Sequence, residues 1–92
     1  MQPDLEKLLQ ETLVWDAHAG IFPSPEVDLN ILQEWLDSGV NYLSINVGFD
    51  VMKWQDTLVT LAAYRHWVQA NSDRFVLVGN AADIERARKE NK

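Results

Sequence analysis

The sequence predicts an α/β fold, in which the strands of a parallel sheet alternate with helices. The first observation is the order of hydrophobic patterns, which reads helix, strand, helix, strand, helix, strand, helix. Such alternation is typical of right-handed βαβ units. The second is the composition, with 47% hydrophobic and 24% charged residues, which is typical of a globular chain. Because an open doubly wound sheet has more strands than this, residues 1–92 are expected to form a single partial domain, the first part of a larger α/β protein.

The first two predicted elements are a short amphipathic helix and a strand. The helix follows Pro3, Asp4 is suited to cap it, and its brevity indicates that it docks onto a neighbour. Residues 12–20 are predicted to form the strand, which must end before the loop at 22–27 because two prolines continue neither helix nor sheet. The apolar positions of the helix, at helical spacing, are Leu5, Leu8 and Leu9.

The middle of the chain predicts a second helix and a second strand. Asp28 is a suitable N-cap for a helix that runs through Asp37, and Gly39 is placed to end it in the left-handed conformation. Residues 40–49 then alternate between apolar and polar side chains, which predicts a strand with one apolar face and one polar, uncharged face.

The last third predicts a long helix, a short strand and a final helix. The long helix covers about residues 51–70, and the strand covers residues 74–78. Asn80 is expected to cap the final helix, with Asp83 in the reciprocal position of a capping box. The buried face predicted for the long helix consists of Trp54, Leu58, Leu61 and Val68.

Charge and composition exclude several classes of function and partner. Eight basic and fourteen acidic residues give a net charge of -6, which argues against a nucleic-acid partner. The absence of cysteine excludes disulfides, thiolate zinc sites and cysteine nucleophiles. The first ten residues do not have the pattern of a signal peptide, and no apolar run is long enough to span a bilayer. We therefore expect a cytoplasmic protein without a membrane partner.

The candidate site lies at the end of the first predicted strand. With a side-chain period of two, Asp16, His18 and Gly20 share one face near the carboxyl end, where parallel α/β sheets bind their ligands. An acid beside a histidine suits a metal ligand with an orienting partner, but it also suits a hydrogen-bonded polar pair in a partly buried sheet. One histidine cannot hold a metal, and His66 is expected to face solvent.

The polar face of the second predicted strand offers further candidates. Ser44 and Asn46 are expected either to line the same cavity as His18, with Asn46 as a substrate-binding residue, or simply to be polar positions of the strand. A small-molecule site formed by Tyr42, Ser44 and Asn46 is a third alternative, based only on their polarity.

Three stretches of the chain carry a resemblance to a known family. They are "LVWDAHAG", "DLNILQEWLDSGVNYLSINVG" and "LAAYRHWVQANSDRFVLVGNAADIERARKENK". Taken in this order, they resemble the N-terminal part of the membrane (renal-type) dipeptidases, zinc peptidases of the metal-dependent hydrolase superfamily. The likeness covers residues 12–92.

The resemblance implies the first βα units of a (β/α)8 TIM-type barrel, incomplete in this chain. It implies a two-metal zinc site that hydrolyses dipeptides by a metal-activated water. In the family's Asp-x-His-x-Asp motif, His18 matches a metal-binding histidine, Asp16 the preceding acid with an orienting role, and Gly20 stands where the metal-binding acid is expected. Because the other ligands lie beyond these residues, we expect the 92-residue chain alone to bind zinc weakly and to hydrolyse no dipeptide.

Two hypotheses of function follow. In the first, the chain is the N-terminal fragment of a zinc-dependent dipeptidase, a metallopeptidase and hydrolase that acts in proteolysis. In the second, it is a stand-alone α/β structural or protein-interaction module without catalysis. Three strands cannot close a barrel, so open sheet edges are expected to be covered by self-association into a homo-oligomer.

Overall fold

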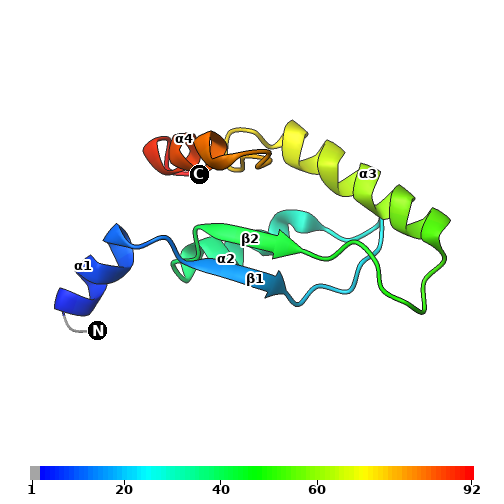
Figure 1. Cartoon of the computed structure of the whole chain (residues 1–92), viewed down its shortest axis with the longest axis horizontal. Helices are drawn as coiled ribbons and strands as arrows, with labels where there is room; N and C mark the ends of the chain where they lie inside the picture. Colours follow the sequence, from blue (N-terminus) through cyan, green and yellow to red (C-terminus); the bar gives the residue numbers. More distant parts are fainter. Residues whose placement is uncertain (1–2) are drawn as a thin grey trace.

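The computed structural model describes residues 3–92 and shows a mixed α/β fold, with four α-helices and a small parallel sheet of two strands (Figure 1). The predicted α/β class is therefore confirmed at this level. The elements in chain order are α1 (Pro3–Glu11), β1 (Trp15–Ala19), the 3₁₀ helix η1 (Leu29–Leu32), α2 (Gln33–Asp37), β2 (Tyr42–Ile45), α3 (Trp54–Ala70) and α4 (Ala81–Lys89).

The two strands pair in parallel and are joined through η1 and α2, as a βαβ unit requires. Trp15 lies opposite Tyr42, Asp16 opposite Leu43 and Ala19 opposite Ile45, with an irregular register between Asp16 and Ala19. Both strands are shorter than the predicted ranges 12–20 and 40–49, because a ladder extends only where two extended segments lie side by side.

The crossover between the strands confirms the predicted helix signals. The Asp28 carboxylate accepts a hydrogen bond from the Asn30 backbone N–H at 3.0 Å and so caps η1. The first turn is a 3₁₀ helix that continues into α2, which ends at Asp37 as predicted. Gly39 follows with a φ of +98°, the left-handed conformation that glycine adopts most readily.

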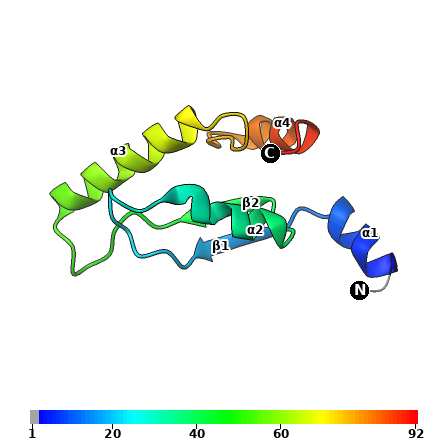
Figure 2. The same ribbon diagram turned by 180° about the vertical axis from the view of Figure 1, so that it is seen from behind.

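The core lies between one face of the sheet, the η1–α2 crossover and the second half of α3. The crossover covers that face, behind the strands in Figure 1 and in front of them in Figure 2. Leu29 and Leu32 are almost completely buried, and Ile21 and Tyr64 complete the centre of the cluster. The partly buried residues packed around it include Val27, Trp35, Leu43, Ile45, Val47, Trp67 and Phe75.

Helix α3 packs through a different face from the one predicted. Thr60 and Tyr64 are its buried residues, and the Tyr64 hydroxyl accepts a hydrogen bond from the Ser24 backbone N–H at 3.4 Å. The prediction was wrong because hydrophobicity alone placed the contact on a stripe that meets little of the sheet. Of that stripe, Trp54, Leu58 and Leu61 are exposed and Val68 is half-buried.

Residues 74–78 do not form the predicted third strand. Arg74 instead ties this segment to the crossover, because its guanidinium donates to Asn30 Oδ1 at 2.7 Å and to Asn71 Oδ1 at 3.1 Å. It also lies over the rings of Trp67 and Phe75. The segment has the apolar composition of a strand but no neighbouring strand to complete a ladder.

The two terminal helices differ in how well they match expectation. In α4 the capping box is confirmed, with the Asn80 side chain accepting from the Asp83 N–H and Asp83 accepting from the Asn80 N–H. In α1 the helix is confirmed, but Asp4 lies within its first turn, after Pro3 at the first position. Among the described residues α1 does not dock, since none of its residues is buried, and docking onto a neighbour stays a prediction.

The molecule exposes more surface than a compact chain of its mass. Its accessible area is 6631 Å², whereas about 5,500 Å² is typical of a folded monomer of this size. Its radius of gyration is 14.6 Å, against about 12 Å for a compact domain. Within residues 3–92, no helix combines the length and the apolarity needed to cross a membrane.

Candidate functional site

Asp16 lies half-buried on β1 and both of its carboxylate oxygens accept hydrogen bonds. Trp35 on α2 donates its indole Nε1–H to Oδ2 at 2.9 Å, and the backbone N–H of His18 donates to Oδ1 at 3.0 Å. The carboxylate therefore joins the end of β1 to the crossover helix. Both oxygens of Asp16 are thus engaged in holding the end of β1 and the crossover together.

His18 has its backbone fixed and its side chain exposed at the end of the strand. Strict alternation is not observed here, since Asp16 is half-buried and His18 exposed, while Ala17 is exposed and Ala19 buried. The register irregularity between Asp16 and Ala19 accounts for this change of pattern. The imidazole is thus open to approach from solvent.

Gly20 is exposed, and a Cβ added to it would meet no atom within 4 Å. Its backbone is not in the left-handed region, in contrast to that of Gly39. Neither packing nor conformation therefore requires a glycine at this position. An acidic side chain at residue 20 would fit the structure as it stands.

Asn46 follows β2 at the same end of the sheet. Because Ala19 pairs with Ile45, the chain places Asn46 next to the continuation of β1 at Gly20. Its side-chain Oδ1 is buried without a hydrogen-bond partner among the described residues. Such a buried acceptor is costly unless a ligand or a solvent molecule satisfies it.

Ser44 and Tyr42 contact Trp15 instead. Ser44 Oγ accepts a hydrogen bond from Trp15 Nε1 at 2.9 Å, and the ring of Tyr42 meets that of Trp15 edge-on at 5.0 Å. The first contact gives the Ser44 hydroxyl a partner within the strand pair, whereas the second involves only the ring of Tyr42. The alternative of a small-molecule site formed by Tyr42, Ser44 and Asn46 stays a prediction.

The described residues do not assemble a complete metal site. Across residues 3–92, no three histidine, aspartate or glutamate side chains converge to bind a metal ion. His66 lies exposed on α3, as predicted. Since zinc takes three or four protein ligands, the donors near His18 do not fit a zinc ion on their own.

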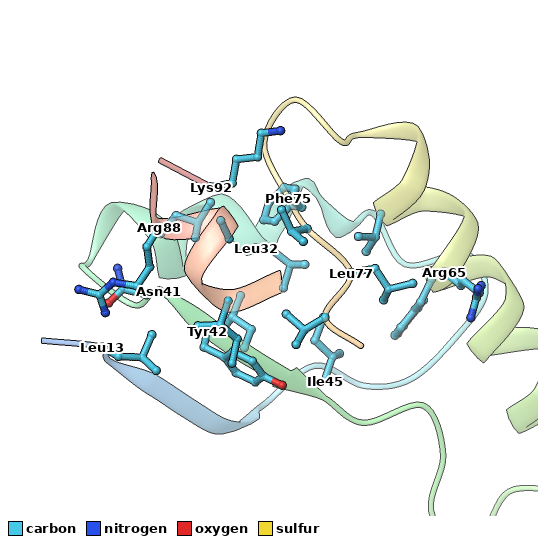
Figure 3. A pocket seen from close by; sticks show the side chains of 18 of the residues that line it. Leu13, Leu32, Asn41, Tyr42, Ile45, Arg65, Phe75, Leu77, Arg88 and Lys92 are labelled. Carbon is cyan, nitrogen blue, oxygen red and sulfur yellow. The ribbon is translucent and has the colours of Figure 1, made fainter. Parts of the chain in front are cut away.

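An apolar cavity of about 280 Å³ lies between β2, residues 75–78, α3 and α4, and we call it the α3–α4 groove (Figure 3). No pattern in the sequence predicted this groove directly, although Leu61 and Val68 belong to the stripe predicted to be buried. A strand at 74–78 paired with β2 would have closed this space. The apolar residues that line the groove include Leu13, Leu36, Leu43, Leu61, Leu77 and Ile84.

Comparison of the chain with protein-family models, with curated proteins and with solved structures found no match. Function is therefore inferred from the residues at the end of β1, from the α3–α4 groove and from the sequence resemblance.

Proposed function

We propose that this chain is the N-terminal part of a zinc-dependent dipeptidase-like hydrolase built on a (β/α)8 barrel. In the complete enzyme, His18 supplies one zinc ligand and Asp16 holds the end of its strand in place. A zinc site of that kind activates a water molecule for attack on the peptide bond of a dipeptide. The chain alone binds zinc weakly and is inactive.

The observation that carries the proposal is the pair of hydrogen bonds to Asp16. They fix a carboxylate beside an exposed histidine at the carboxyl end of a parallel strand. This is the end at which parallel α/β folds bind ligands. The division into one fixed acid and one accessible imidazole agrees with the roles that the resemblance implies for Asp16 and His18.

Asn46 supports a substrate-binding role at the same end. Its buried Oδ1 has no partner among residues 3–92 and is positioned one residue beyond the pair of Ala19 and Ile45. A carbonyl oxygen accepts hydrogen bonds from N–H groups, which a dipeptide provides at its amino end and at its amide. We assign Asn46 to substrate binding on this ground.

The α3–α4 groove supports the incomplete-barrel part of the proposal. In a closed α/β barrel, each strand is flanked by two others and each helix packs on the sheet. Here residues 75–78 lie across the groove from β2 and remain unpaired. Further strands of a barrel would bring the apolar lining of the groove into a continuous core.

Calorimetric titration with zinc tests the proposed ligand position. Wild-type chain is expected to bind weakly, and Gly20→Asp is expected to tighten binding by about tenfold, roughly 1.4 kcal/mol, because it restores an acid beside His18. Gly20→Ala is the matched control and should leave affinity unchanged. The gain should disappear in the double variant His18→Ala/Gly20→Asp.

Two results would contradict the proposal. Submicromolar zinc affinity of the wild-type chain that depends on His18 would show a complete site within these residues. Equal affinity of Gly20→Asp and Gly20→Ala would remove residue 20 from the ligand set. The reading frame downstream of codon 92 gives an independent test, since a continuation into a strand ending in glutamate is expected and a stop codon favours the non-catalytic module.

The alternative function, a self-associating module without catalysis, is favoured by the surplus of exposed surface. The exposed surface that favours this alternative includes the α3–α4 groove, whose lining does not contain the residues of the proposed zinc site.

A further inference from the structure

The α3–α4 groove is open to solvent and apolar. Leu61 on α3 and Leu77 are 48% and 43% exposed although both line it. The surface of the whole chain exceeds that of a compact monomer by about 1,100 Å². A stable interface of standard size covers about 800 Å² on each partner, so the surplus is sufficient for one such interface.

Cationic residues stand at both ends of the groove. Arg65 lies at the α3 end, Arg88 lies at the end near Asn41 and Leu13, and Lys92 lies at the upper edge beside Phe75 (Figure 3). The Lys92 ammonium also forms an ion pair with Glu90, with 3.5 Å between Nζ and Oε2. Because the chain as a whole carries a net charge of -6, this basic rim distinguishes the groove from the rest of the surface. An occupant with an apolar face and acidic flanks would complement it.

Helix α1 has those properties. Its stripe of Leu5, Leu8 and Leu9 is exposed along its length. At the 100° that separates successive helical residues, Asp4 and Glu6 lie roughly 100° to either side of the stripe. Lys7 points away from it and forms an ion pair with Glu11 at 3.9 Å. The helix therefore presents leucines with an acid on each flank.

The position of α1 favours a second copy of the chain as the partner of this groove. Helix α1 lies at one end of the long axis of the molecule and projects away from the other elements (Figures 1 and 2). Arg88 holds its last turn at the edge of the groove by donating to the Glu11 carbonyl oxygen at 3.3 Å. So placed, the leucine stripe of α1 stays exposed on its own chain.

We infer that two copies form a symmetric dimer by exchanging α1. The helix of each copy places Leu5, Leu8 and Leu9 in the α3–α4 groove of the other. Asp4 and Glu6 then meet the basic rim of that groove. The contact is isologous and closed, so it produces dimers and not chains of molecules. The inference concerns a different surface from the zinc site and applies to the 92-residue chain by itself, because the further strands of the proposed barrel would occupy the same groove.

Sedimentation equilibrium of the 92-residue chain tests the dimer. Wild type is expected to be dimeric, and Leu8→Asp is expected to raise the dissociation constant by about 100-fold or more, because each dimer contains the leucine contact twice. Val51→Asp is the matched control, since Val51 is 79% exposed and lies outside both α1 and the groove. Circular dichroism should show that both variants keep the wild-type helix content.

Disulfide trapping identifies the occupant of the groove. The chain contains no cysteine, so introduced thiols react without background. Mixing Leu8→Cys chains with Leu61→Cys chains under oxidation should yield a covalent heterodimer, while Leu8→Cys mixed with Val51→Cys should not. A monomeric wild type, a dimer that Leu8→Asp and Val51→Asp leave equally intact, or a bond that forms only within a Leu8→Cys/Leu61→Cys chain would overturn the inference.

Discussion

The 3₁₀ helix η1 buries its two leucines, whereas helix α1 leaves its three leucines exposed to solvent. Leu29 and Leu32 are 1% and 2% exposed. Leu8 on α1 is 58% exposed, although all three are leucines in short helices. Hydrophobic character alone therefore does not decide burial in this molecule. The difference is whether segments that are distant in the sequence pack against the leucine.

We call the part of the molecule around Leu29 and Leu32 the packed region, and the α3–α4 groove with the two terminal helices the open region. Polar contacts hold segments that are distant in the sequence together in the packed region. Arg74 reaches across to Asn30, and Tyr64 accepts a hydrogen bond from Ser24, so the end of α3 and the segment after it are fixed onto the crossover. At the α3–α4 groove the corresponding long-range polar contact lies at one edge, where Arg88 donates to the Glu11 carbonyl oxygen. We therefore expect the packed region to contribute most of the folding free energy, because it buries the most apolar surface.

The largest effect is expected for Leu29→Ala, because this side chain is in the centre of the packed region. Removing its methyl groups should lower the free energy of unfolding by about 3 kcal/mol. Urea denaturation followed by circular dichroism measures the loss. Leu58→Ala is the control from the exposed stripe of α3 and should change stability by less than about 0.5 kcal/mol. Equal losses would remove the distinction between the two regions.

A smaller effect is expected for Gly48→Ala, which tests how closely α3 approaches the chain after β2. A Cβ at Gly48 would overlap the side chain of Thr57, so the substitution should cost about 1–3 kcal/mol in unfolding free energy. Gly20→Ala is the matched control, because its Cβ enters open space. Thermal unfolding should show a lower midpoint for Gly48→Ala alone, and an unchanged midpoint would mean that α3 is not in contact there.

The smallest effect is expected for Asn80→Ala in the open region. Loss of the capping box should cost about 1 kcal/mol, and the cost should be confined to α4. Amide hydrogen exchange should then quicken in α4 while the amides around Leu29 and Leu32 keep their protection. Uniform loss of protection throughout the chain would show instead that both regions unfold as one unit.

Local signals in the sequence predicted the structure correctly where a residue and its hydrogen-bond partner are close together in the chain. The cap of η1 at Asp28, the left-handed Gly39 and the capping box of Asn80 with Asp83 were all predicted and are observed. Each depends on hydrogen bonds or backbone angles within a few residues. Such features need no knowledge of the tertiary fold.

Features that depend on distant partners were predicted less well. Residues 74–78 are apolar enough for a strand, but a strand also needs another strand beside it, and none is present there. The buried face of α3 was misplaced because Tyr64 packs through contacts with Ser24 and the core, which no helical periodicity reveals.

The candidate site shows the same limit. Spacing on the strand identified Asp16 and His18, and the orienting role assigned to Asp16 remains a prediction that its hydrogen bonds support. The partner that fixes Asp16 is Trp35, nineteen residues away on a helix. Nothing in the pattern of the strand indicates that contact, because it arises from the crossover folding back over the sheet.

The hydrogen bond from Trp35 to Asp16 also gives the end of β1 an intrinsic optical reporter. The emission of an indole responds to the charge and geometry of the carboxylate that accepts its N–H, and this carboxylate also holds the backbone of His18. Any ligand that moves the end of β1 changes the surroundings of Trp35. The difference in fluorescence between wild type and Trp35→Phe therefore reports on that movement without an added dye.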